Sequence, residues 1–170
     1  ASLGHEVLAY DIDENKIDAL NQGKSPIYEA GLSERLQSPN LQFTTDLSSA
    51  VAYSPIQFIC VGTPESADGS ADLSYVTRCA ETIADQMTED KLIVIKSTVP
   101  VGTGDALMAH LATRLTSRHI QVKARLISNP EFLREGLAIA DFMHPERVII
   151  GGDDRLAMET VARLYQAITD

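Results

Sequence analysis

Two carboxylates, Glu131 and Glu135, follow a strand-like run and an Asn-Pro pair, a pattern that can support acid–base chemistry. Proline disfavours helical geometry in the residue before it and suits a first helical turn, so we expect a helix to begin here, capped by Asn129. Carboxylates four residues apart project from one face of a helix, beside a positively polarised end where polar ligands bind. The alternative interpretation is an ordinary capped helix with solvated acidic side chains.

Acidic and hydroxyl side chains occupy the same position after other strand-like runs. Asp11, Thr63 and Thr98 each follow an apolar run, and Lys16 lies in the helix predicted after Asp11. Taken singly, Asp11 is explained as a helix cap, the threonines as turn residues and Lys16 as a solvated lysine. Parallel strands end at one edge of a sheet, where ligands bind in α/β proteins, so we favour one shared site over independent turns.

Strand-like runs alternate with segments of helical periodicity, which predicts an α/β fold with a Rossmann-like doubly wound parallel sheet. In dinucleotide-binding units, the acid that binds the adenosine ribose follows a glycine-rich turn by roughly 20 residues. Asp11 comes too early for this, so we expect the first strand and the glycine-rich turn of the fold to be lacking in this chain. The predicted strands cover residues 7–10, 41–44, 56–61, 92–96, 122–128 and 147–150; one predicted helix closes near residue 23, and others cover 33–36, 46–53, 73–87, 105–118 and 154–168.

Composition limits the classes of function. The 170 residues are 44% hydrophobic and 22% charged, which fits one globular domain with a sizeable core. A net charge of -10 argues against nucleic acid as a partner, because that affinity rests on lysine and arginine neutralising phosphates. No apolar run approaches the roughly 20 residues of a membrane span and no signal peptide opens the chain, so no membrane partner is expected.

The two cysteines, Cys60 and Cys79, lack paired metal-ligand spacing, and no metal site is predicted. Two cysteines in a chain of this size fit a reducing, cytoplasmic compartment. Cys60 lies in a run predicted to be a buried strand and Cys79 in a predicted helix, so neither is expected to be a reactive thiol.

Several motifs in order resemble the UDP-glucose/GDP-mannose dehydrogenase family, and they span essentially the whole chain. The matching stretches are Leu3-Gly4-His5-Glu6-Val7, Asp11-Ile12-Asp13 with Lys16, Pro26-Ile27-Tyr28-Glu29 with Gly31-Leu32, Val61-Gly62-Thr63-Pro64, Ser97-Thr98-Val99-Pro100-Val101-Gly102-Thr103, Asn129-Pro130-Glu131-Phe132-Leu133-Arg134-Glu135-Gly136 and Pro145-Glu146-Arg147-Val148. Ordered motifs are more specific together than any one alone.

The resemblance implies NAD as cofactor and a four-electron oxidation of UDP-glucose to UDP-glucuronate, which serves polysaccharide biosynthesis. The stretch 26–29 favours UDP-glucose over the alternatives GDP-mannose and UDP-N-acetylmannosamine. A non-catalytic nucleotide-binding module is the alternative from another class, because a fold alone does not establish activity.

The resemblance also assigns roles to residues. Asp11 would hold the adenosine ribose, and Glu131 would act with water in hydrolysing a thioester. The implied catalytic residues are Thr98, Glu131 and Glu135; the cofactor-binding residues are Asp11, Lys16, Thr63, Thr98 and Glu135; the substrate-binding residues are Glu131, Phe132, Leu133, Arg134 and Glu135; no metal is implied.

Residues 1–170 are interpreted as part of an N-terminal NAD-binding domain. Members of the family continue into a central helix and a second domain that carries the catalytic cysteine, lysine, asparagine and aspartate, and these are not found here. We therefore expect the chain alone to be inactive, and the resemblance implies a homo-oligomer formed through the central helix.

Overall fold

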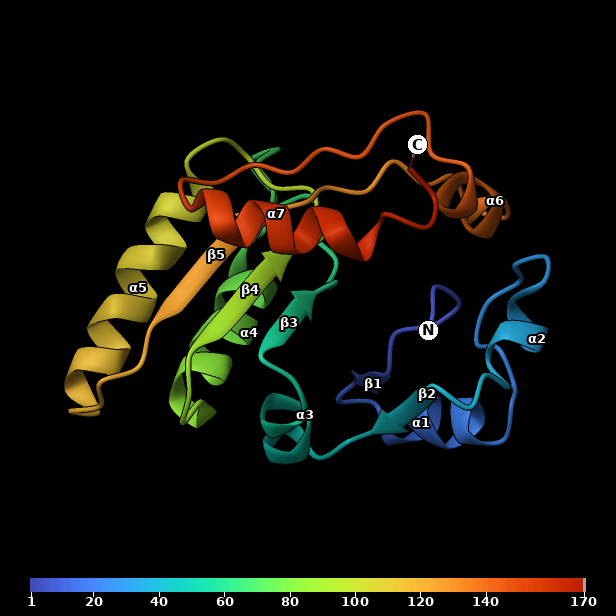
Figure 1. The fold of residues 1–170 in the computed structure, drawn as a ribbon, viewed down its shortest axis with the longest axis horizontal. Coiled ribbons are helices and arrows are strands. Elements are labelled where there is room, and N and C mark those ends of the chain that lie inside the picture. The colour runs from blue at the N-terminus through green and yellow to red at the C-terminus, as the bar shows by residue number, and fades with distance from the viewer. Residues whose placement is uncertain (170) are drawn as a thin grey trace. The chain divides into compact units, whose positions relative to one another are not determined.

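The computed structural model describes residues 1–169, which form five strands and seven helices joined by loops (Figure 1). The fold divides into two compact units. The first comprises residues 1–53, 132–147 and 164–169, and the second comprises residues 54–131 and 148–163. Every strand pair in either unit is parallel, which confirms the predicted α/β class with parallel sheets.

The first unit is built on two parallel strands, paired from Val7 with Leu41 to Tyr10 with Thr44. Helix α1 packs on β2 and buries Ile17, which is 4% exposed. The carboxylate of Asp13 begins this helix by accepting hydrogen bonds from the amides of Asn15 and Lys16, at 3.0 and 3.2 Å. The elements of this unit are β1 (Val7–Tyr10), α1 (Glu14–Asn21), α2 (Leu32–Arg35), β2 (Leu41–Thr44), α3 (Leu47–Tyr53) and α6 (Ala138–Met143).

The second unit holds a three-stranded parallel sheet in the order β3-β4-β5. All five residues of the central strand β4 are buried, as its continuous apolar run predicts for a strand covered on both faces. The helical connections between consecutive parallel strands are the βαβ arrangement of a doubly wound fold. The elements are β3 (Ile56–Ile59), α4 (Ser74–Gln86), β4 (Lys91–Ile95), α5 (Thr103–Ser117), β5 (Ala124–Ser128) and α7 (Arg155–Leu164).

Helices shield this sheet from water. In Figure 1, α7 crosses in front of the strands and α4 lies behind them, while α5 packs against β5 and α4. Each helix presents a small or branched apolar stripe, with Val76, Ala80, Leu111 and Val161 all fully buried. On α4 the buried residues recur at helical spacing, as expected for a helix that covers a sheet with one face.

Residues 147–150 do not form the predicted last strand. Directly after them, an isolated antiparallel bridge joins Gly151 to Ser128. Gly152 lies so close to β5 that a Cβ there would stand 2.6 Å from Ile127 Cδ1. The carbonyl of Ile149 accepts a hydrogen bond from the Asn129 side chain at 2.8 Å. A side chain thus occupies this carbonyl, which the prediction had paired with a neighbouring strand.

Candidate functional site

The carboxyl ends of β3, β4 and β5 form one edge of the sheet in the second unit. The amide of Lys96 donates to the carbonyl of Ile59 at 2.8 Å, and the amide of Asn129 donates to the carbonyl of Ile95 at 2.9 Å. These bonds extend the ladder one residue beyond the strands and hold the following loops in register. Ligands bind at this edge in doubly wound proteins, so the loops after the three strands form the candidate site.

Thr63 and Thr98 come together in two of these loops. The Thr63 hydroxyl donates to the carbonyl of Thr98 at 3.0 Å, and the Ser97 hydroxyl donates to the carbonyl of Val61 at 2.6 Å. Ser97 is 7% exposed, so its hydrogen bond joins the two loops in the protein interior. The side chain of Thr98 lies at the surface. The two predicted threonines are thus neighbours across adjacent strand ends.

Asn129 and Pro130 lead from β5 to Glu131, and here the predicted helix is wrong. Residues 129–134 are irregular, and α6 begins only at Ala138. Asn129 is 1% exposed and its side-chain amide donates to the Ile149 carbonyl, and no helix follows directly for its side-chain oxygen to cap. Arg134 donates its amide to Asp141 and not to a carbonyl one helical turn earlier, which removes the helical ladder. Glu131 and Glu135 therefore do not share a helix face.

Glu131 remains at the sheet edge, exposed in the loop directly after the Asn-Pro pair. The ammonium of Lys96 lies 3.4 Å from the carbonyl oxygen of Pro130, within hydrogen-bond distance. Burial lowers the pKa of Lys96, while the nearby Glu131 carboxylate and Cys60 act to raise it. A lysine, a carboxylate and a thiol thus interact electrostatically at the ends of three neighbouring strands.

Cys60 lies just past the end of β3 and its surface is exposed, which corrects the prediction of a buried strand position. The protein atoms around the sulfur nevertheless disfavour a thiolate and raise the pKa of Cys60 to about 11, more than the charge of Lys96 lowers it. The same effect of burial raises the pKa of Cys79. Both thiols stay protonated near neutral pH, as expected for unreactive cysteines.

Asp11 and Lys16 belong to the first unit, where they form a salt bridge. The Asp11 carboxylate also accepts the amide of Asp13 at 3.1 Å. Partial burial acts to raise the pKa of Asp11, but these hydrogen bonds and the charge of Lys16 outweigh it, so the pKa lies below its ordinary value. Asp13, and not Asp11, caps α1, which removes the helix-cap explanation for Asp11.

The side chains after Glu131 lie in the first unit. Both sides of the Arg134 guanidinium bind Asp141, at 3.0 Å from Nε and 2.6 Å from Nη2, and this hydrogen bonding lowers the pKa of Asp141 to about 2. The Arg147 guanidinium stacks 4.6 Å from the centre of the half-exposed Phe132 ring. Leu133 is partly buried and Glu135 is exposed.

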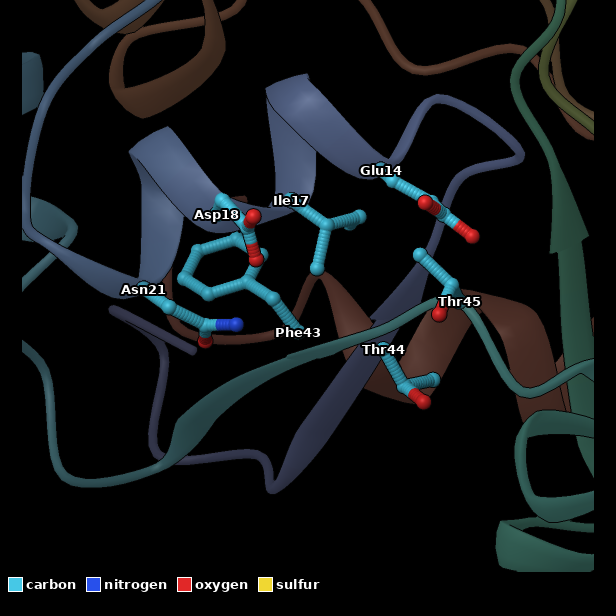
Figure 2. Close-up of a pocket in the computed structure, with 7 residues that line it drawn as sticks. All are labelled: Glu14, Ile17, Asp18, Asn21, Phe43, Thr44 and Thr45. Atoms are coloured by element: carbon cyan, nitrogen blue, oxygen red, sulfur yellow. The ribbon is translucent and has the colours of Figure 1, made fainter.

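A separate pocket of about 320 Å³ lies in the first unit, between α1 and the end of β2 (Figure 2). Figure 2 shows its polar side chains reaching from the helix toward the strand, with an apolar floor between them. No predicted site residue is among those that line it. The lining residues are Glu14, Ile17, Asp18, Asn21, Phe43, Thr44 and Thr45.

Within residues 1–169, no three histidine, cysteine or acidic side chains gather closely enough to hold a metal ion. No helix in the same part of the chain is long and apolar enough to cross a bilayer.

The parallel sheets, the helical connections and the polar loops at the carboxyl ends of the strands define a dinucleotide-binding domain of the doubly wound α/β class. Residues 1–169 match the UDP-glucose/GDP-mannose dehydrogenase family, NAD binding domain. The chain belongs to this family, whose cofactor is NAD, and the resemblance drawn from the motifs is confirmed.

Similar proteins include UDP-glucose 6-dehydrogenases from two bacteria. That of Rhizobium meliloti is 45% identical, over 99% of this chain and 39% of the relative. TuaD of Bacillus subtilis is 43% identical, over 98% of this chain and 36% of the relative. The chain therefore spans less than two fifths of the length of either protein.

Two solved structures have the same fold over nearly all of the chain. A UDP-glucose dehydrogenase from Pyrobaculum islandicum superposes with a TM-score of 0.89 at 39% identity, covering 99% of this chain and 40% of that one. A GDP-mannose dehydrogenase from Pseudomonas aeruginosa gives a TM-score of 0.89 at 36% identity, covering 98% of this chain and 40% of that one.

The sequence indicated Thr63, Thr98 and Glu131 by their positions after strands, but it gave no role to Lys96. Its signal was a single cation that closes an apolar run, Leu92-Ile93-Val94-Ile95, immediately before the Ser97-Thr98 turn. A lysine at this point is ordinarily explained as a solvated strand end. Only the pairing of β4 with both neighbours shows that it lies between two strand-end loops.

Proposed function

We propose that the chain is the NAD-binding part of a UDP-glucose 6-dehydrogenase. The reaction converts the C6 alcohol, two NAD+ and one water into a carboxylate, two NADH and three protons. The observation that carries the proposal is the position of Glu131, an exposed carboxylate directly after the Asn-Pro pair at the carboxyl end of β5. The identities of 45 and 43% with UDP-glucose 6-dehydrogenases support the choice of UDP-glucose.

Asp11 suits the adenosine ribose of NAD. Its side chain is 29% exposed, and its carboxylate keeps lone pairs beyond those used by Asp13 and Lys16. Bound NAD supplies the hydride acceptor for both oxidations. In this proposal Thr63 and Thr98 line the cofactor path, while Phe132, Leu133, Arg134 and Glu135 border the sugar nucleotide.

Glu131 is proposed as the base of the hydrolytic step. After the second oxidation the substrate is held as a thioester on a cysteine of the second domain, as the family resemblance implies. Glu131 takes a proton from water as the water oxygen attacks the thioester carbonyl, and the C–S bond then breaks to release the carboxylic acid and the thiolate. The acid loses its remaining proton to solvent and becomes the carboxylate. An exposed carboxylate at the sheet edge is accessible to water for this step.

The full-length protein supplied with UDP-glucose and NAD is expected to form two NADH per sugar, whereas residues 1–170 alone form none. The chain alone has only Cys60 and Cys79 as thiols, and the pKa of Cys60 is raised to about 11. Absorbance of NADH and chromatography of the products measure both. Turnover of GDP-mannose in place of UDP-glucose would reject the proposed substrate. Steady turnover by the chain alone that is lost in Cys60→Ala would reject the assignment of the catalytic cysteine to the second domain.

Asp11→Ala in the full-length protein is expected to raise KM for NAD by about 10- to 100-fold, because charged hydrogen bonds contribute roughly 1.5–3 kcal/mol. The unmutated protein should prefer NAD to NADP, since the carboxylate repels a 2′-phosphate. The variant should lose much of this preference because Lys16 remains. The exposed Asp18 on α1 supplies the control Asp18→Ala, for which KM should not change. Equal use of both cofactors by the unmutated protein would refute the assignment.

A further inference from the structure

We propose that Lys96 is a positioning residue for Glu131. Its ammonium binds the Pro130 carbonyl, which fixes the turn that carries Glu131 at the edge of the sheet. This inference rests on the proposed function, because it assigns Lys96 to the hydrolytic step performed by Glu131.

The backbone of Lys96 is held by the strand on one side. Its amide donates to Ile59 at 2.8 Å, and on the other side the Ile95 carbonyl accepts the amide of Asn129 at 2.9 Å. β4 is the central strand of its sheet, so Lys96 lies between the loops that follow β3 and β5. This fixed backbone position places the start of the Lys96 side chain between the two loops.

The Lys96 ammonium reaches the loop after β5, where it lies 3.4 Å from the Pro130 oxygen. Pro130 is joined to Glu131 by one peptide bond, so this contact restrains the peptide from which the carboxylate extends. Asn129 restrains the same turn from the other side through its 2.8 Å bond to Ile149. Two side chains on different strands thus hold the two residues that precede Glu131.

The charges around Lys96 agree with this role. The titratable groups that interact with it are Cys60, after β3, and Glu131, after β5, and burial opposes its positive charge. Cys60 stays a neutral thiol near pH 7 because its pKa is raised to about 11. Glu131 is therefore the anion that interacts with the half-buried Lys96.

The test uses the full-length protein with Lys96→Met, which keeps side-chain length and removes the charge, and Lys96→Arg, which keeps the charge. Single-turnover hydrolysis of the thioester is followed at pH 7. In Lys96→Met the hydrolysis rate should fall by roughly 10-fold, an effect of the size expected for a mispositioned base. Lys96→Arg should restore most of the rate, because it can still donate to the Pro130 carbonyl. The control Lys123→Met removes an exposed charge and should behave as the unmutated protein.

A double-mutant cycle provides a readout that needs no activity. Thermal midpoints are measured for Lys96→Met, Glu131→Gln and the double variant, and the double shift should differ from the sum of the single shifts by about 2 °C or more. The pair Lys123→Met and Glu131→Gln should be additive.

If the midpoint shifts are non-additive but the unmutated protein does not oxidise UDP-glucose, the proposed function is rejected and the Lys96–Glu131 interaction stands. Additive midpoints with an unchanged rate of thioester hydrolysis in Lys96→Met would overturn the role of Lys96. If Lys96→Met does not fold, the cycle with Lys96→Gln decides the question by the same criteria.

Discussion

Glu131→Gln in the full-length protein is expected to produce a burst of NADH followed by steady turnover lowered by about 10²- to 10⁴-fold. Glutamine preserves the shape of the side chain and can still hydrogen bond, but it cannot accept a proton from water. Both oxidations precede hydrolysis, so they should proceed once and leave the sugar attached to the protein as a thioester. Mass spectrometry of acid-quenched samples measures this adduct.

The burst separates a chemical role of Glu131 from a structural one. Glu131 caps no helix, so its replacement should cost little more than its interaction with Lys96, and the protein should stay folded with a thermal midpoint only a few degrees lower. Glu6→Gln, an exposed acid before β1, is the control and should show neither burst nor adduct. A well-folded Glu131→Gln protein that turns over at the parental rate without a trapped sugar would make Glu131 a structural acid and leave Glu135 as the next candidate.

The strands and helices of the second unit were largely predictable because burial on both faces leaves a long apolar signature. Residues 92–96 gave such a run, and β4 is observed at Lys91–Ile95. Residues 147–150 have equally strong strand propensity but no partner strand, and they are irregular. Strand propensity is realised only when a neighbour completes the hydrogen-bond ladder, and a single sequence does not reveal which neighbours exist.

The candidate site was predictable only as far as strand ends mark it. Thr63 and Thr98 were expected near each other, and their 3.0 Å contact agrees. The helix expected after Pro130 was wrong because contacts distant in sequence hold this segment: the Asn129 side chain donates to the Ile149 carbonyl, and the Arg134 amide donates to Asp141. Lys96 was missed for a related reason, since its contact with Pro130 spans 34 residues.

Asn129→Asp in the full-length protein is expected to lower the free energy of unfolding by roughly 3–5 kcal/mol at pH 7. Asn129 is 1% exposed and its amide donates to the Ile149 carbonyl at 2.8 Å. A carboxylate there would oppose a carbonyl oxygen and carry a buried charge, whereas Asn129→Ala removes only the hydrogen bond and should cost roughly 1–3 kcal/mol.

The pH dependence identifies the charge as the cause. Burial should raise the pKa of the new aspartate in the folded protein above its unfolded value of about 3.9. Below that unfolded value the acid is neutral in both states and can donate to the Ile149 carbonyl, so the penalty should nearly vanish. As pH rises above the unfolded pKa, the unfolded state loses this proton while the native state keeps it, so the penalty grows, and it reaches its full size above the folded pKa. Unfolding midpoints between pH 4 and 8 measure this, with Asn129→Ala as the reference. If the difference between the two variants is the same at every pH, then water or a backbone shift has relieved the buried charge, and the Asn129–Ile149 contact is not the rigid support that positions Glu131.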